Sequence, residues 1–560
     1  MKRIWIVFLA AMLLFSAAAC SSDKGGAADK DAVDNGDFDE IDAAKLPSKI
    51  DLRDYDGKNY VTPVKSQQYG DCWAFAQAAA AETSYLFANE MGVPAGEIND
   101  QVDFSEKYIA WYMFHGITGD DVAVGKVRAS QVGEGFDLSE AEKNMDVAAY
   151  IIGGKYIDRA NLFGSGFGPV DESVSVKGET PYAYDDMSEV EWKLPLNAEY
   201  RNAPTQAVFR NSCSLPSPAG KDENGGYAFN EDGLNAIKSE ISQGHTVTFG
   251  LRSMHPGFNI KNKTVYYDGD ESPDHAVAVV GYDDDYAKEN FARTDSGDKV
   301  IEGTTPPENG AFIIKNSWGL ADNDDDGFLY LSYYDHSITT PMSYEFDKSD
   351  SAGATALNYD QYDLMMTAWY GSTDYDEETK TANVFDAEED ESLCQIEYTT
   401  GSEKTEVSYE IYKGVEADDP ASGEMLEKGV SRHLYPGCHR IDLEDEYALK
   451  KGDRYAVVLT MKRVADEDGE MVYTEVFPYS APFFNGMAVS GVINEGESYL
   501  YTDGKWVDMT NLKEDLIERA YQQGKDNFDE EEEGLYITPK GKEDYTVDNY
   551  PIKAILKTHK

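Results

Sequence analysis

The chain has 560 residues, a formal net charge of −56 and 41% hydrophobic residues. This length accommodates two or three domains, and the apolar content is enough for full cores, which excludes a wholly disordered protein. So large a negative charge argues against a nucleic-acid binder, which needs a basic face, and against adsorption to anionic lipid headgroups. An acidic surface that keeps an exported protein soluble is the simpler interpretation, and attraction of cationic substrates is the alternative.

Residues 1–20 form a predicted export signal. Two basic residues precede the apolar run 4–19, which is too short to span a bilayer comfortably and ends in small residues. The ending Ala-Ala-Ala-Cys resembles a bacterial lipobox in which Cys20 would carry lipid, although Ala17 stands where leucine is usual. An ordinary signal peptide cleaved nearby is the alternative. Residues 21–45 are small, acidic and unpatterned, and they predict a flexible tether.

The cysteines are too few for a disulfide scaffold, and none forms the paired CxxC pattern of a zinc site. They are Cys20, Cys72, Cys213, Cys394 and Cys438. Cys394 and Cys438 lie in one later segment and are candidates for a disulfide, because export permits one. If Cys20 carries lipid, Cys72 and Cys213 have no evident partner.

Cys72 stands at the predicted start of a helix. Turn-forming residues 69–71 precede it, and an alanine-rich run without glycine or proline follows through Glu90. Unpaired amides and the helix dipole favour negative charge at such a position, which lowers the pKa of a thiol. The thiolate is the nucleophile in covalent catalysis, so the placement suits that role. A buried structural cysteine is the alternative.

Two later segments supply the residues that a nucleophilic cysteine needs. His275 opens an apolar run that predicts a buried strand ended by Gly281. Residues 310–319 predict another strand, which delivers Asn316 and Trp318 to a turn. The asparagine can hold an imidazole in one tautomer, and the indole can shield that hydrogen bond and lie on the substrate side. With the cysteine, these residues provide a nucleophile, a base and an orienting group.

Taken together, the three segments resemble the papain-like cysteine peptidases, in the order Cys, His, Asn. Similarity to the family extends to residues 46–67, 104–112, 168–184 and 234–251. The resemblance implies an α+β domain over residues 46–350, with a helical lobe and a β lobe. It also implies roles in peptide-bond hydrolysis: Cys72 attacks the carbonyl, His275 forms an ion pair with Cys72 and later protonates the leaving amine, and Asn316 orients His275.

The resemblance further implies an oxyanion site made by the backbone N–H of Cys72 and the side chain of Gln67. Gln67 stands five residues before the cysteine, one fewer than is usual in the family, and Gln68 is the alternative donor. Gly133 and Gly135 are candidates for presenting backbone to an extended peptide substrate. An ordinary loop turn is the alternative for these two glycines.

Other departures from the family pattern mark insertions. Tyr69 replaces a half-cystine that many relatives have, and the long spacing between cysteine and histidine implies insertions around 120–145 and 185–230. The tether is too short for the long helical inhibitory segment of many relatives. The acidic run 322–327 resembles a calcium loop but lacks the glutamate at its twelfth position, so an acidic turn is favoured. No metal or cofactor is predicted.

From residue 356 onward the sequence changes to short β signals separated by turns. They occur at 405–412, at 455–461, at 550–557 and in a hairpin around Asp503 and Gly504. The pattern predicts an all-β sandwich. It resembles the lectin-like domain that follows papain-like peptidases in some bacterial surface proteins, over residues 356–558. The acidic stretch 511–547 is expected to be an insertion or loop, and sugar binding does not follow from the resemblance.

The resulting hypothesis is an exported, lipid-anchored cysteine endopeptidase with an accessory β-sandwich, located outside the cytoplasm on a bacterial membrane or secreted. Its partners would be protein or peptide substrates, with a glycan or cell-surface ligand left open for the second domain. A membrane contact would run only through the lipid, and no nucleic acid is expected. The alternatives are an adhesion or carbohydrate-binding protein with the peptidase domain as scaffold, and a peptide-ligating acyl transferase. A scaffold has no need of all three catalytic side chains.

Overall fold

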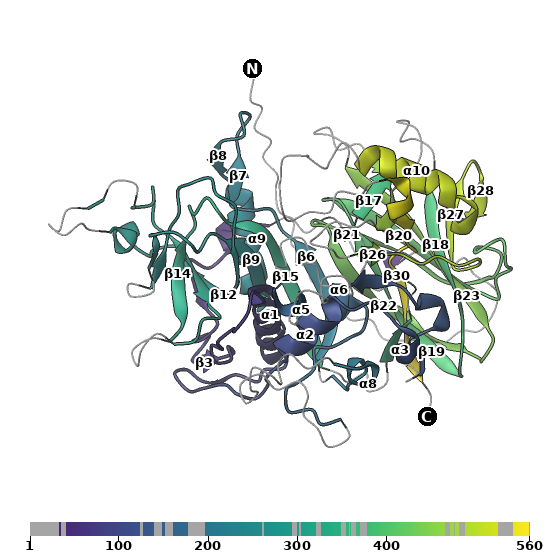
Figure 1. The fold of residues 1–560 in the computed structure, drawn as a ribbon, viewed down its shortest axis with the longest axis horizontal. Coiled ribbons are helices and arrows are strands. Elements are labelled where there is room, and N and C mark those ends of the chain that lie inside the picture. Colours follow the sequence, from purple (N-terminus) through teal and green to yellow (C-terminus); the bar gives the residue numbers. More distant parts are fainter. Residues whose placement is uncertain are drawn as a thin grey trace, which may run out of the picture.

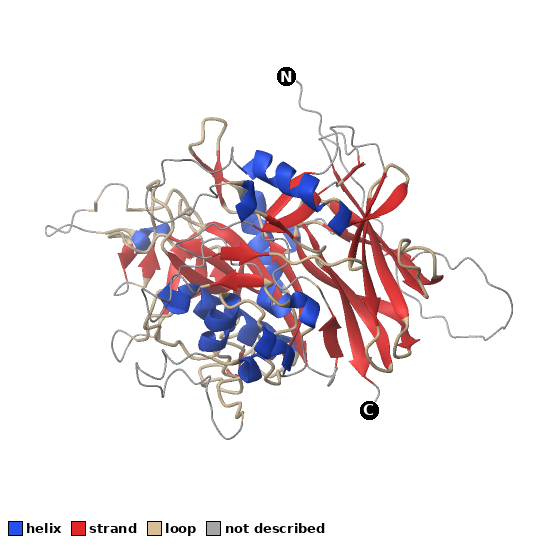
Figure 2. Ribbon diagram, turned by 45° about the vertical axis from the view of Figure 1, so that its right-hand side comes forward, coloured by secondary structure: helices blue, strands red, loops and turns tan. Residues whose placement is uncertain are grey.

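Two regions lie side by side in the computed structural model (Figure 1): an N-terminal region up to residue 348 and a C-terminal region from residue 354. The structure describes residues 33–34, 38, 41–123, 127–138, 148–151, 161–176, 196–205, 207–259, 263–293, 300–301, 304–320, 326–348, 354–357, 359, 366–369, 378–464, 471–474, 476–480, 488–524 and 541–558. Most helices gather around the N-terminal region, and strands dominate the C-terminal one (Figure 2).

The long helix α1 forms the centre of the N-terminal region. It runs from Cys72 to Ala88, and nearly every one of its side chains is buried, which fits a run that is apolar on all faces. The next helix, α2, begins after Ser105, whose Oγ accepts a hydrogen bond of 3.0 Å from the backbone N–H of Tyr108. The helices are α1 (Cys72–Ala88), α2 (Glu106–Met113), α3 (Gly119–Ala123), α5 (Ala148–Ile151), α6 (Asn161–Gly164), α8 (Ala198–Arg201), α9 (Glu231–Ser242) and α10 (Lys513–Gly524).

One large sheet runs through both regions. Strands β12, β9 and β15 of this sheet pack against α1. In spatial order the strands are β10 (Phe258–Asn259), β11 (Thr264–Val265), β14 (Phe328–Ser332), β13 (Ala311–Lys315), β12 (His275–Asp283), β9 (Thr246–Leu251), β15 (Thr339–Lys348), β6 (Ala207–Ser214), β22 (Gly437–Leu449), β19 (Glu391–Thr400), β30 (Ile552–Thr558) and β16 (Ala354–Leu357), with β2 (Lys49–Asp51) beside β12.

The two regions join within this sheet, at the antiparallel pair β6–β22. Residue Asn211 of β6 lies opposite His439 of β22, and Cys213 lies opposite Gly437. Strand β6 belongs to the second of the predicted insertions. The second region is therefore attached by backbone hydrogen bonds as well as by the covalent chain.

The C-terminal region is a sandwich of two sheets. One layer is the β22–β19–β30–β16 end of the large sheet, and the other is a separate sheet in the order β1 (Val33–Asp34), β21 (Glu424–His433), β20 (Thr405–Lys413), β23 (Arg454–Val464), β18 (Lys380–Asp386), β27 (Ser498–Thr502) and β28 (Lys505–Asp508), with β24 (Met471–Tyr473) beside β23. Buried side chains such as Ile396 and Leu556 from the first layer meet Tyr409 and Leu459 from the second. This is the packing that alternating strands produce.

Short sheets and single turns complete the described part. The pairs are β3 (Lys58–Asn59) with β4 (Val93–Pro94), β5 (Gly135–Asp137) with β26 (Ala488–Ser490), and β7 (Ala219–Lys221) with β8 (Tyr227–Phe229); β17 (Met366–Trp369), β25 (Val476–Ser480) and β29 (Thr546–Val547) form a three-stranded sheet. The 3-10 helices span Ala43–Lys45, Ala129–Gln131, Lys288–Phe291, Met509–Asn511 and Lys542–Asp544. Among the described residues, no helix is long and apolar enough to cross a membrane.

Several predicted strands are confirmed, including the hairpin around Asp503 and Gly504, where both residues have positive φ. Two expectations were wrong. The strand that begins at His275 does not end at Gly281 but continues to Asp283, because β2 pairs with its last three residues. The acidic stretch 511–547, expected to be an insertion or loop, contains α10, so the loop alternative is wrong for that part; the apolar side chains of α10 pack on the sandwich core.

Two other expectations also need correction. Residues 33–34, within the predicted flexible tether, form a strand that pairs with β21. Cys394 and Cys438 do not form a disulfide. Their strands are neighbours, but the thiol of Cys394 donates to the carbonyl of Ile555 and that of Cys438 to Glu397, so the two side chains have different partners.

Candidate active site

Cys72 is the first residue of α1 and lies against the beginning of β12. The backbone N–H of Ala276 donates to Cys72 Sγ at 3.4 Å. The thiol is half-buried and is not in a disulfide. The sulfur therefore sits at a helix N-terminus, next to the residue that follows His275, and it has access to solvent.

The side chain of His275 is fixed by Asn316. His275 Nε2 and Asn316 Oδ1 are 2.8 Å apart, and both side chains are buried. Asn316 Oδ1 also accepts from the backbone N–H of Ser317 at 2.8 Å, which fixes it as an acceptor. Nε2 must then carry the proton of this hydrogen bond, so Nδ1 has a free lone pair.

Burial and an aromatic cover determine the state of this imidazole. Burial lowers the pKa of His275 to about 4, although the hydrogen bond to Asn316 acts in the opposite direction. The indole of Trp318 stacks on the imidazole with ring centroids 4.6 Å apart, and 37% of Trp318 remains exposed. At neutral pH the imidazole is therefore a neutral base with one ring face shielded from water.

Asp71, which precedes Cys72, is another buried titratable group. Its side chain is fully buried, and burial raises the pKa of its carboxyl to about 7. It does not cap α1 through a side-chain hydrogen bond. The charge next to Cys72 therefore changes near neutral pH.

Gln67 is held in place from both ends of its amide. Its Oε1 accepts from Ser317 Oγ at 2.6 Å, and its Nε2 donates to the carbonyl of Tyr69 at 2.6 Å. An amide NH₂ has two hydrogens, so one N–H remains for a further acceptor. The neighbouring Gln68 is exposed. Its side chain lacks the fixed orientation of Gln67.

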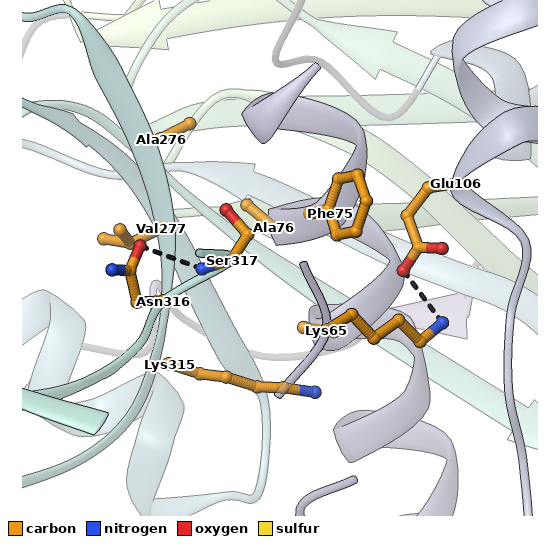
Figure 3. Close-up of a pocket in the computed structure, with 10 residues that line it drawn as sticks. Lys65, Phe75, Ala76, Glu106, Ala276, Val277, Lys315, Asn316 and Ser317 are labelled. Carbon is orange, nitrogen blue, oxygen red and sulfur yellow. Dashed lines mark hydrogen bonds and ion pairs between the residues drawn. The ribbon is translucent and has the colours of Figure 1, made fainter. Parts of the chain in front are cut away.

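A group of charged side chains lies around the pocket that Asn316 and Ser317 help to line (Figure 3). Lys65 Nζ lies 2.9 Å from Glu106 and 3.5 Å from Glu82, and Lys315 Nζ lies 3.6 Å from Glu82. Together with Asn316, three of these side chains (Lys65, Glu106 and Lys315) line a cavity of about 10 Å³, which has room for roughly one water molecule. We call Lys65, Glu82, Glu106 and Lys315 the rear cluster.

The rear cluster and the adjacent buried Glu172 contain more carboxyl groups than amino groups. Burial of the surplus negative charge raises the pKa of Glu106 to about 8, while the nearby lysines lower the pKa of Glu82. Glu106 Oε2 has no hydrogen-bond partner within the part of the chain that the structure describes. Glu106 is therefore the carboxyl that retains a proton at neutral pH.

Gly133 and Gly135 lie away from these residues in their described contacts. Both have φ of +97°, and the backbone N–H of Gly133 donates to the carbonyl of Ile117 at 2.9 Å. Gly135 pairs with Ser490 of β26. Their backbone is thus engaged by the protein itself, which fits the alternative of a structured turn better than an open peptide-binding edge.

Two other predicted sites, Cys20 and residues 322–325 of the possible calcium loop, lie outside the described residues. Within the described ranges, no group of three or more His, Cys, Asp or Glu side chains could hold a metal ion.

Comparison with known proteins identifies both regions. Residues 167–346 match the papain family cysteine protease model, and residues 359–521 match the lectin-like domain model. A peptidase 1 from Psoroptes ovis is 34% identical over 87 residues, which is 15% of this chain and 24% of the relative. The match thus spans about a quarter of that relative's length.

Two solved structures share the whole arrangement at 20% identity. The clostridial cysteine protease Cwp84 after propeptide cleavage covers 92% of this chain and 100% of its own, with a TM-score of 0.58. The cysteine protease and lectin-like domains of Cwp84, a surface layer associated protein of Clostridium difficile, cover 92% and 90%, with a TM-score of 0.59. The chain therefore has a papain-family cysteine protease domain followed by a lectin-like domain, and the predicted α+β fold class is confirmed.

The structure brings Cys72, His275 and Asn316 into one site with Trp318 and Gln67. The rear cluster and the buried carboxyl of Asp71 were not predicted from the sequence. A signal was present, since Glu82 interrupts a long apolar helix and buried charges need partners. The partners are distant in sequence, so the pattern alone does not identify them.

Proposed function

We propose that this protein is an exported cysteine endopeptidase that uses Cys72 as nucleophile, His275 as base and Asn316 as the residue that orients the base. The observation that carries the proposal is a thiol at the start of α1, which accepts from the backbone N–H of Ala276, next in the chain to a neutral imidazole that Asn316 holds. A structural cysteine would need neither partner. The proposed division places the peptidase domain at 46–350 and the lectin-like domain at 356–558.

The reaction follows from these positions. Nδ1 of His275 takes the thiol proton, and Cys72 Sγ attacks the scissile carbonyl to form a C–S bond and an oxyanion. The imidazolium then gives its proton to the leaving nitrogen as the C–N bond breaks. A water molecule, deprotonated by the same imidazole, hydrolyses the acyl-enzyme and restores the thiol.

Gln67 is the proposed oxyanion donor, together with the backbone N–H of Cys72. The proposal is supported by the two hydrogen bonds that hold the amide, from Ser317 and to Tyr69, while one N–H stays available. A donor held in advance stabilises the developing charge without reorganising, which is the main source of its effect. Gln68 lacks this support.

Export and lipid attachment at Cys20 complete the proposal, supported by the signal-like start of the chain. The similar Cwp84 is described as a surface layer associated protein, in line with a location outside the cytoplasm. Wild-type protein should partition into a detergent phase and the Cys20→Ser variant into water. An unmodified mature N-terminus at another position would contradict the lipid anchor.

Incubation with unfolded casein, followed by mass spectrometry of the products, tests the activity. Hydrolysis gives new N-termini with wild-type protein and none with Cys72→Ala. Joined peptides would instead indicate a peptide-ligating acyl transferase. No change in the casein would leave the domain as a scaffold for adhesion, and a glycan array would then be the next measurement.

A further inference from the structure

One segment of the peptidase domain connects the lectin-like domain to the active site. We call residues 128–137 the docking segment. Its Arg128 donates to the hydroxyl of Tyr359 at 3.0 Å and to the carbonyl of Asp386 at 3.2 Å. Asn494 Nδ2 donates to the carbonyl of Ser130 at 3.2 Å. Arg128 also lies 3.4 Å from Glu388, so the beginning of the segment is held by four residues of the lectin-like domain.

The end of the docking segment is held more closely. Strand β5 pairs with β26 of the lectin-like domain, where the two domains meet (Figure 1). Between the two glycines of the segment, Glu134 is only 2% exposed, and its Oε2 accepts from the backbone N–H of Val492 at 2.8 Å. A buried carboxylate that receives a backbone N–H makes a stronger bond than a neutral acceptor.

The docking segment is also tied to the residues that follow α2. The backbone N–H of Gly116 donates to the carbonyl of Phe136 at 2.7 Å, and that of Ile117 donates to the carbonyl of Glu134 at 2.8 Å. A Cβ at Gly116 would lie 2.4 Å from that second carbonyl, so the close approach requires glycine. Any shift of the docking segment must therefore move the end of α2.

Aromatic packing continues this connection to the nucleophile. Phe136 packs edge-on against Phe114 with centroids 5.5 Å apart, and Phe114 packs edge-on against Trp73 at 5.4 Å. All three rings are buried. Trp73 is the residue next to Cys72 in α1. Tightly packed interiors transmit displacements because they contain little free volume.

From these contacts we infer that the lectin-like domain helps to position Cys72, with Glu134 as the central positioning residue. Val492 and β26 hold Glu134 and β5, and these support Phe136, Phe114 and Trp73. The lectin-like domain is then part of the catalytic framework and not a separable appendage. The inference rests on the proposed function, because it concerns the reactivity of the same cysteine.

A second contact between the domains provides a matched control. Arg210 of β6 binds Asp442 of β22 with contacts of 3.2 and 2.9 Å, and Asp442 is largely exposed. Like Arg128, Arg210 is an arginine that bridges the two domains. The side chain of Arg210 binds Asp442 and Asp347, and neither of these residues belongs to the docking segment or to the three aromatic rings.

The experiment compares full-length Glu134→Ala, Glu134→Gln, Arg128→Ala and Arg210→Ala with wild-type protein. Three quantities are measured: kcat, KM and the rate at which iodoacetamide alkylates Cys72. Glu134→Ala should lower kcat and the alkylation rate about tenfold, with little change in KM, because positioning affects the reacting sulfur. Glu134→Gln keeps an acceptor for Val492 and should restore most of the rate. Arg210→Ala should match wild-type protein.

Equal alkylation rates in Glu134→Ala and wild-type protein would overturn the inference, as would an equal loss in Arg210→Ala. If Glu134→Ala fails to fold, Arg128→Ala is compared with Arg210→Ala instead. A lower kcat and alkylation rate in Arg128→Ala alone would support the inference, and equal rates in the two variants would overturn it. If wild-type protein cleaves no peptide, the proposed function fails. The alkylation rates still test the positioning of Cys72 in that case.

Discussion

Two buried groups of charged side chains, one in each domain, are balanced in opposite ways. In the rear cluster of the peptidase domain, carboxyl groups outnumber amino groups, and Glu106 keeps a proton. In the lectin-like domain, buried Glu397 accepts from Arg440 at 2.8 and 2.5 Å and from Lys553 at 2.9 Å, and these cations lower its pKa. The first group is unbalanced and borders Asn316, while the second is fully paired.

This difference separates a functional use of buried charge from a structural one. A buried charged group needs a partner of opposite charge close to it. A buried group without such a partner becomes neutral by taking up or releasing a proton. Paired charges hold strands β19, β22 and β30 in one arrangement. An unmatched group beside the active site can change its charge within the ordinary range of pH. We therefore expect substitutions in the rear cluster to change the catalytic rate or the response of the protein to pH. Substitutions around Glu397 should mainly change stability.

The largest effect should follow from Cys72→Ala. Proteolysis should fall at least about a thousandfold, because the nucleophile is absent, while the melting temperature stays nearly constant. Activity assays and thermal melts of the two proteins measure both quantities. Cys213→Ala is the control, since burial raises the pKa of that thiol and it should remain inert. Retained activity in Cys72→Ala would refute the assignment.

Gln67→Ala should lower kcat by roughly a hundredfold with little change in KM, because the lost hydrogen bond forms mainly in the transition state. Steady-state kinetics on one peptide substrate are sufficient to measure this. Gln68→Ala provides the matched control and should be close to neutral. The reverse pattern would make Gln68 the donor, and two neutral variants would remove the oxyanion assignment.

Glu397→Ala should destabilise the protein by about 3–5 kcal/mol, because it leaves two buried cations without their counter-ion. Urea unfolding gives the free energy, and kcat per folded molecule should remain near that of wild-type protein. The exposed pair of Glu446 and Lys557 offers a control, since Glu446→Ala should cost less than about 1 kcal/mol. Similar losses in both variants would show that the buried pairing contributes little.

Glu106→Gln should change how stability depends on pH. The folded protein holds the Glu106 proton up to about pH 8, whereas an unfolded glutamate releases it near pH 4.5. The folded state then binds more protons in this window, so wild-type stability falls as pH rises from about 4.5 to 8. The Glu106→Gln variant lacks this decline. Its stability relative to wild-type protein should therefore be higher at pH 8 than at pH 5. A relative loss at pH 8 would mean that Glu106 is ionised and paired with Lys65.

Much of the site could be predicted from sequence because its signals are local. Cys72 follows a turn and begins a helix, and His275 and Asn316 lie at the start and end of apolar strands. Alternating residues likewise identified β20, and a continuous apolar run after a turn identified β23. In each of these elements the side-chain period agrees with the structure that forms.

The remaining features depend on contacts between distant residues. Pairing of β6 with β22 and of β5 with β26 joins segments far apart in the chain, and no local pattern specifies such partners. Helix α10 has apolar side chains at Leu516 and Ala520 with helical spacing, but its many charges suggested a loop. The rear cluster is buried only because two helices and a strand meet there.

Selective alkylation of the wild-type protein tests the central claim most directly. Iodoacetamide at neutral pH should label Cys72 first and remove proteolytic activity in proportion, because the other described thiols, Cys213, Cys394 and Cys438, are buried or have a raised pKa. Peptide mapping by mass spectrometry identifies the labelled residue. Loss of activity with Cys72 unlabelled, or full activity with Cys72 labelled, would contradict the assignment of Cys72 as the nucleophile.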